Sequence, residues 1–218
     1  MKKEKIKIFA VAVFFLMLFI LWTALIQIVD VQPIGPQGSS VGFAALNDFF
    51  HKFTDVHMNL YIITDWLSII PAFFIIGFGS LGLIQWIKRK NIFKVDFDIL
   101  ILGVFYIIVM ALYLLFEVWS INFRPVIING FLEASYPSST TLLVLFVMST
   151  AIIQLNNRIK NTKLKKFAGN LIIAFIVFMV IARLVSGVHW FSDIIGGIFL
   201  SAGLVAMYYF LYKIKKDL

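Results

Sequence analysis

The chain has 218 residues, of which 61% are hydrophobic and only 14% are charged, and its formal net charge is +8 at pH 7. Soluble globular domains are about a quarter charged and less than half apolar, so this composition excludes a soluble domain and indicates that the solvent is lipid. The sequence contains no cysteine, which excludes disulfide and thiolate chemistry. We expect a single domain over residues 1–218, because nothing in the sequence resembles a low-complexity tail or an internal repeat.

Six apolar segments are long enough to cross a bilayer as helices, which takes roughly 20 residues each. The first follows basic residues as a signal peptide would, but its apolar run is too long for one, so we expect it to be retained as a span. The second contains Asp65 and Pro71 and is long enough to tilt or kink. We expect the spans at about residues 8–29, 60–86, 97–118, 138–155, 167–185 and 191–212. The sequence therefore predicts an all-α integral membrane protein built as a six-helix bundle.

The positive charges indicate how these spans are oriented. Of the 19 lysines and arginines, 16 lie in the N-terminus, the loops after the second and fourth spans, and the C-terminus. Six spans place all four segments on one side, which the positive-inside rule makes cytoplasmic. These cations flank apolar spans, so they favour membrane orientation over a nucleic-acid footprint. Lys52, Arg124 and Arg183 remain on the outer side, where ionisable groups at membrane depth are usually functional.

The longest outer segment, residues 30–59, is predicted to contain an interfacial helix. Phe43, Leu46, Phe50 and Phe53 recur at three- and four-residue spacing with polar residues among them, as in an amphipathic helix. Such a helix can act as a cap on the bundle or as a gate for lipids, and the sequence does not choose between these roles.

The second and third outer segments carry residues suited to anion chemistry. Pro137 and the hydroxyl residues Ser138, Ser139 and Thr140 open the fourth span, and Arg124 lies in the loop before it. A helix N-terminus with a nearby arginine is an anion site.

In the third outer segment His189 and Asp193 are four residues apart, so on one helix they would share a face. A carboxylate bound to one imidazole nitrogen fixes the tautomer and leaves the other nitrogen as a nucleophile or base. We therefore expect Asp193 within direct hydrogen-bond reach of His189.

This pattern resembles the type 2 phosphatidic acid phosphatase family, which shares its core with the vanadium haloperoxidases. The similarity by motif covers residues 117–193. Arg183, His189 and Asp193 have the spacing of the family's third motif, and Arg124-Pro125 matches the end of the first. The resemblance implies a vanadium haloperoxidase-like core, His189 as a nucleophile oriented by Asp193, and Arg124 and Arg183 as phosphate clamps. It also implies that Ser138, Ser139 and Thr140 lie beside the phosphate.

Two positions depart from the family pattern. Glu117 stands where the first motif has lysine, so its charge needs a partner, for which we expect Arg124 first and Lys52 as an alternative. Thr140 stands where the second motif has the histidine that protonates the leaving alcohol. Losing a positioned general acid typically lowers the reaction rate roughly 10²–10⁴-fold. The loss would be smaller for a lipid pyrophosphate, because its leaving group departs more easily without protonation.

We therefore expect a membrane phosphatase or phosphotransferase that acts on a lipid phosphate or pyrophosphate at the outer face through a phosphohistidine. It would need no cofactor and no metal, because the arginines and the helix N-terminus supply positive charge. The main alternative is a degenerate relative that binds or moves lipid headgroups without catalysis. A small transporter is a distant third, because its inverted repeats are absent from the sequence. The membrane is expected to be a bacterial cytoplasmic membrane.

Overall fold

The computed structural model describes residues 2–216, and its regular secondary structure is helical. Its elements, in chain order, are α1 (Lys2–Ile26), a 3₁₀ turn η1 (Pro36–Gly38), α2 (Ala44–Thr54), α3 (Met58–Leu67), α4 (Ile69–Arg89), a 3₁₀ turn η2 (Ile92–Lys94), α5 (Phe97–Val118), α6 (Ser139–Arg158), α7 (Thr162–Val185) and α8 (Phe191–Lys216). No β-strand forms within this part of the chain.

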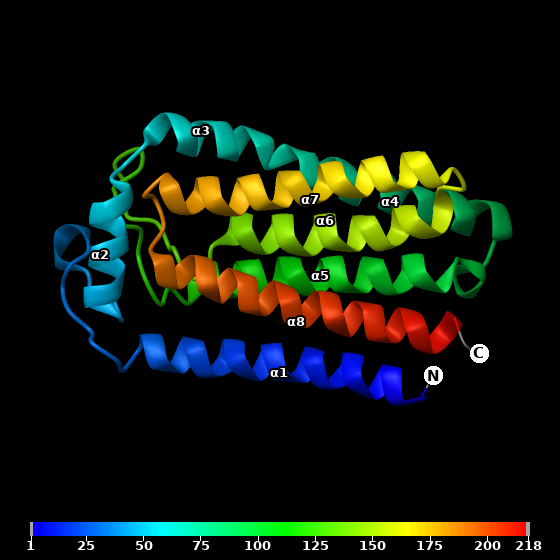
Figure 1. The fold of residues 1–218 in the computed structure, drawn as a ribbon, viewed down its shortest axis with the longest axis horizontal. Helices are drawn as coiled ribbons and strands as arrows, with labels where there is room; N and C mark the ends of the chain where they lie inside the picture. The colour runs from blue at the N-terminus through cyan, green and yellow to red at the C-terminus, as the bar shows by residue number, and fades with distance from the viewer. Residues whose placement is uncertain (1, 217–218) are drawn as a thin grey trace.

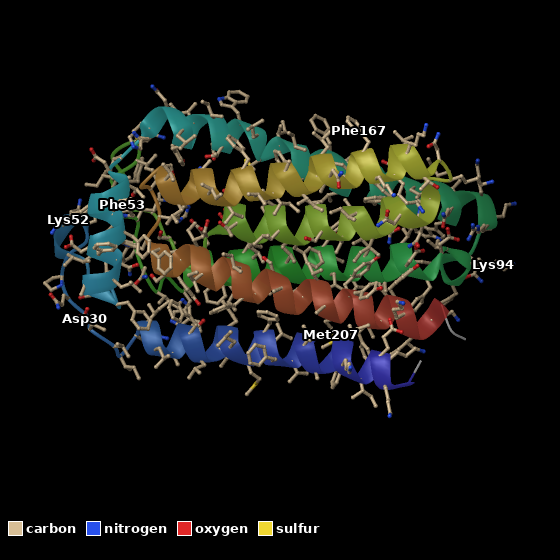
Figure 2. The ribbon with its side chains drawn as sticks, in the orientation of Figure 1. Asp30, Lys52, Phe53, Lys94, Phe167 and Met207 are labelled. Carbon is tan, nitrogen blue, oxygen red and sulfur yellow. The ribbon has the colours of Figure 1, made fainter. Side chains whose placement is uncertain are left out.

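Six helical spans are long and apolar enough to cross a membrane, which confirms the predicted six-helix membrane fold. They are α1, the α3–α4 pair as one span of 32 residues, α5, α6, α7 and α8. The spans run back and forth along one axis, and the N- and C-termini lie at the same end of the bundle (Figure 1). Lys94 lies at that end and Lys52 at the opposite end (Figure 2). We call these the terminal end and the far end.

The second span is broken into α3 and α4 at Ser68. Pro71 has no N–H to donate to the carbonyl of Leu67 one turn earlier, and its ring crowds that carbonyl, so the helix is interrupted just before it. At the far end, α3 packs against α7. The helix is therefore interrupted close to Pro71, where the sequence suggested a tilt or kink.

The predicted interfacial helix is α2, which lies across the far end of the bundle (Figure 1). Its buried Asn47 donates to the Ser192 hydroxyl at 2.9 Å and accepts from the Ser192 backbone N–H at 3.0 Å, at the start of α8. Phe50 stacks on Phe191 with ring centroids 4.1 Å apart. Phe53 is 80% exposed. One face of α2 thus covers the start of α8, as expected of a cap.

A cluster of aromatic side chains fixes the segment that leads into α6. The buried Tyr136 packs edge-on against Phe116 at 5.9 Å and stacks with Phe19 at 6.2 Å. Its hydroxyl forms a 2.6 Å hydrogen bond with Thr23 of α1. Since Ser138 follows two residues later, these contacts hold the N-terminus of α6 in place.

Candidate active site

The turn between α7 and α8 presents His189 at the far end of the bundle. Gly187 has φ +68°, and a β-carbon there would lie 2.1 Å from the backbone oxygen of Asp55, so only glycine fits. The α8 helix begins at Phe191, after His189. His189 and Asp193 therefore do not share a helical face, which corrects the argument made from their spacing.

A serine links His189 to Asp193 in place of the direct hydrogen bond expected from the sequence. The Ser135 hydroxyl donates to Asp193 Oδ2 at 2.5 Å, and the same oxygen lies 3.0 Å from His189 Nδ1. All three residues are buried. Because the hydroxyl proton goes to the carboxylate, we assign the proton between imidazole and serine to Nδ1. That tautomer leaves the lone pair of His189 Nε2 free.

Asp193 ties the two outer loops together. Its Oδ1 accepts from the Asn122 amide at 3.0 Å, and its Oδ2 accepts from the Trp190 backbone N–H at 3.0 Å in addition to Ser135. The side chain is completely buried, and every hydrogen bond it accepts comes from a neutral donor. The carboxylate thus fixes both the loop before α6 and the turn before α8 around His189.

A cavity of about 210 Å³ opens beside this network. Its lining includes His189, Arg124, Ser139, Glu117 and Glu133. His189 Nε2 is buried and has no hydrogen-bond partner in residues 2–216. An unpartnered imidazole nitrogen, a guanidinium and the start of a helix therefore face one space, whereas Glu117 and Glu133 add negative charge to it.

Arg124 has hydrogen-bond donors to spare. Its Nε lies 3.1 Å from Glu133 Oε2, close enough for an ion pair but without hydrogen-bond geometry. Both Nε and Nη1 are buried and lack a hydrogen-bond partner within the described chain. The carboxylate paired with Arg124 is that of Glu133, so the expected Glu117–Arg124 pair does not form. Glu117 lines the cavity with an exposed side chain.

Arg183 is bound by residues of α3 and α6. Its Nη1 donates to Thr64 Oγ1 at 3.0 Å, its Nη2 donates to Thr140 Oγ1 at 2.7 Å, and Nη2 lies 3.5 Å from Asp65. Its guanidinium carbon lies 4.8 Å from the Tyr61 ring centroid. Only Nε of this guanidinium has no partner within the described residues. Arg183 and Thr140 do not belong to the cavity lining.

The two arginines are nevertheless neighbours. The Tyr61 ring lies 5.7 Å from the guanidinium carbon of Arg124 as well as 4.8 Å from that of Arg183. Cation–π contacts of this kind place both positive charges around one ring. Arg124, His189 and the start of α6 thus line one cavity, whereas Arg183, which was expected to bind the same phosphate, does not belong to the lining.

The N-terminus of α6 is only partly available to a ligand. Ser138 is the N-cap, and its backbone N–H donates to the carbonyl oxygen of Asp193 at 3.1 Å, so that donor is already used. The backbone N–H groups of Ser139 and Thr140 form no hydrogen bond within residues 2–216. These two donors remain at the positive end of the helix dipole.

Lys52 lies away from the cavity. It forms a 2.6 Å ion pair with Asp48 one turn earlier on α2, and its side chain is 74% exposed. The hypothesis that Lys52 compensates the charge of Glu117 was therefore wrong, because the Lys52 ammonium group pairs with Asp48 on its own helix.

Burial and the two arginines lower the pKa of the His189 imidazole well below its usual value. Desolvation is the largest cause, and the charges of Arg124 and Arg183 act in the same direction. This lowered pKa favours the neutral form of the imidazole. Among residues 2–216, no group of three or more histidine, aspartate or glutamate side chains could hold a metal ion.

Sequence reasoning missed several residues of this arrangement, among them Asp65, Ser135 and Glu133. Asp65 could have been found, because a carboxylate inside an apolar span is costly unless it has a partner. Ser135 and Glu133 lie in a loop whose course is irregular, and no spacing rule relates them to His189 or Arg124. Their contributions depend on how that loop folds back over α8.

Comparisons with known proteins agree with the fold and with the family resemblance. No match was found among curated proteins. The structure is similar to the crystal structure of a transmembrane PAP2 type phosphatidylglycerolphosphate phosphatase from Bacillus subtilis. The TM-score is 0.65 and the identity 18%, over 94% of this chain and 96% of that chain. The family model described as PAP2 superfamily matches residues 99–216. That match covers more than half of the sequence and includes every residue of the His189 network, so the chain belongs to the PAP2 superfamily.

Proposed function

We propose that this membrane protein removes or transfers the phosphoryl group of a lipid phosphate or pyrophosphate at the far end of the bundle, through a phosphohistidine at His189. One observation supports this above all others. His189 Nε2 and the Arg124 donors Nε and Nη1 are buried without partners, and both residues line the same cavity. Buried polar atoms are normally paired, so atoms left open toward one space are suited to a polar ligand.

The reaction follows from the geometry. The Nε2 lone pair of His189 attacks phosphorus, and the bond from phosphorus to the leaving oxygen breaks. Arg124 and the free backbone N–H group of Ser139, which both line the cavity, stabilise the charge on the equatorial oxygens. Nδ1–H remains hydrogen-bonded to Ser135, whose link to Asp193 stabilises the imidazole as it becomes positive. Water then attacks phosphorus, and the phosphorus–nitrogen bond breaks as the new phosphorus–oxygen bond forms, which releases phosphate and restores the imidazole.

The structure also bears on the leaving group. Thr140 Oγ1 accepts a hydrogen bond from Arg183 and is not part of the cavity lining, so it is badly placed to protonate a leaving alkoxide. Instead it orients the guanidinium. A phosphate leaving group needs little protonation, so we propose a lipid pyrophosphate, or an ester with an acidic leaving group, as the better substrate.

A second function is favoured by the two carboxylates in the cavity. Glu117 and Glu133 repel a phosphate dianion, and Arg124 already faces Glu133. A relative that holds a headgroup without cleaving it would tolerate these charges and the absence of a general acid. The substrate would then bind, and no phosphate would be released.

Phosphate release from purified protein in detergent separates the two functions. The panel contains a lipid pyrophosphate, phosphatidate and aryl phosphates of graded phenol acidity. We expect turnover that rises with leaving-group acidity, complete loss in His189→Gln, and unchanged rates in His57→Gln, a matched change at an exposed histidine outside the cavity. Undetectable turnover across the panel, with lipid phosphate still bound, would support the binder.

A further inference from the structure

A second, larger cavity lies on another part of the bundle. It is an open groove of about 790 Å³ formed by α1, α6 and α8. The α8 helix packs against both α1 and α6, and the groove follows it from Ile198 to Lys213. His189 precedes α8 altogether, so this groove is separate from the candidate active site and extends toward the terminal end.

Small side chains create this groove. Ser201, Ala202 and Ala206 of α8 and Ser149 of α6 line it, and none of them is large enough to fill the space between neighbouring helices. The Ser201 hydroxyl donates to the backbone oxygen of Gly197 at 2.6 Å, so its polarity is satisfied within its own helix. The middle of the groove is therefore suited to an apolar chain.

The length of the groove corresponds to one leaflet of a bilayer. At 1.5 Å per residue, the stretch of α8 from Ile198 to Lys213 is about 22 Å long, and that of α6 from Leu145 to Asn157 is about 18 Å. The hydrocarbon core of a bilayer is about 30 Å thick, so one leaflet accounts for about 15 Å and its headgroups for the remainder. An acyl chain with its headgroup fits these dimensions.

Polar and cationic side chains are gathered at the terminal end of the groove. Lys7, Asn156, Asn157 and Lys213 line it there. Lys213 Nζ forms an ion pair with Glu4 Oε1 at 3.3 Å, whereas Lys7 has no ion-pair partner within residues 2–216. An occupant with an anionic head and an apolar tail would complement both parts of the groove.

We propose that this groove is a binding site for one anionic phospholipid of the leaflet on the side of the termini, with its headgroup at Lys7 and an acyl chain along α8. The site is independent of the phosphatase chemistry, because it shares no residue with the His189 cavity. It stabilises the packing of α1, which contacts the bundle chiefly through α8.

Native mass spectrometry of the purified protein tests this proposal with two probes of identical acyl chains, anionic phosphatidylglycerol and zwitterionic phosphatidylcholine. We expect one phosphatidylglycerol to be retained per chain in preference to phosphatidylcholine. The double variant Ala202→Leu/Ala206→Leu fills the groove and should lose that lipid. Ala111→Leu, at an exposed alanine of α5 outside the groove, should keep it.

Lys7→Gln tests the headgroup contact without altering the packed interior. Removing one lysine from a lipid-facing surface weakens anionic-lipid binding about fivefold. Lys163→Gln, an exposed cation at the same end but outside the groove, should have no such effect. The proposal would be overturned if the wild type retained the two lipids equally, or if the Ala202→Leu/Ala206→Leu variant retained phosphatidylglycerol fully. It would also be overturned if the wild type were a dimer and the double variant a monomer, because the groove would then bind a second copy of the chain.

Discussion

At the scale of single residues, the Ser135 bridge distinguishes this site from a simple histidine–aspartate pair. Ser135→Ala removes both hydrogen bonds, so Nδ1 loses its partner and Asp193 loses its shortest contact. Hydrogen bonds to charged groups contribute about 1.5–3 kcal/mol, so we expect kcat to fall roughly 10- to 150-fold with little change in KM. Steady-state kinetics on the preferred substrate measures both quantities.

Ser135→Thr serves as the matched control, because threonine keeps the hydroxyl and adds only one methyl group. Recovery of most of the lost kcat would show that the hydroxyl positions His189. A threonine variant as slow as the alanine variant would show that only packing at this position matters.

The protonation of His189 gives a second prediction at this scale. Burial and the two arginines lower its pKa, so the imidazole should remain neutral at pH 6.5, where an ordinary histidine is half protonated. ¹⁵N spectra of the protein, with the signal assigned by its loss in His189→Gln, report this directly. An Nε2 signal that titrates near pH 6.5 would contradict the buried, arginine-flanked environment.

The same shift has a consequence for stability. The folded state binds this proton less readily than the unfolded chain does, so stability is retained above about pH 6.5 and is lost as the pH falls below it. His189→Gln removes the titrating group. The melting temperature of the wild type should therefore fall more steeply between pH 7 and pH 5 than that of the variant.

At the scale of elements, α2 depends on one buried amide. Asn47 donates to Gly42 at 2.7 Å and to Ser192 at 2.9 Å, and it accepts from the Ser192 N–H at 3.0 Å. Asn47→Ala loses all three hydrogen bonds, which we expect to cost about 2–4 kcal/mol, mostly as undocking of α2. Hydrogen exchange of the α2 amides should accelerate markedly.

Asn59→Ala is the matched control, since Asn59 is exposed on α3. It should leave α2 protection unchanged. If α2 exchanges equally slowly in both variants, the apolar contacts of Phe50 with Phe191 hold the helix without the amide.

At the scale of the whole molecule, the fold was predictable because membrane spans can be recognised in a sequence by their length, their hydropathy and the charges that flank them. All six predicted spans agree with the observed helices to within a few residues at most ends. The largest differences are at the terminal end, where charged residues such as Lys3 and Lys163 continue the helices. Backbone hydrogen bonding continues there beyond the apolar stretch, which hydropathy alone does not reveal.

The site was less predictable than the fold. The motifs placed Arg124, His189 and the start of α6 near one another correctly, because each lies in or beside an outer loop, but they also placed Arg183 there, which is outside the cavity lining. The contacts made by loop residues were not predictable, since the position of Ser135 between His189 and Asp193 follows from the folded path of the loop. The prediction for Lys52 was wrong because the sequence indicates on which side of the membrane a residue lies, but not how far that residue is from the cavity.

The orientation of the molecule is a further prediction. Both termini are expected in the cytoplasm, so the far end should face outward. The chain has no cysteine, so Ser40→Cys and Phe131→Cys, both exposed at the far end, provide unique labels. A membrane-impermeant thiol reagent should label both in intact cells and label Lys90→Cys only after permeabilisation. The reverse pattern would invert the topology.

The central claim is that His189 carries the phosphoryl group, and rapid quenching tests it most directly. Wild-type protein is mixed with ³²P-labelled lipid pyrophosphate, quenched in alkali within milliseconds and digested for peptide mapping. We predict alkali-stable, acid-labile label on His189, formed before phosphate is released and missing in His189→Gln. Label on another residue, or phosphate release at the wild-type rate by His189→Gln, would contradict the account.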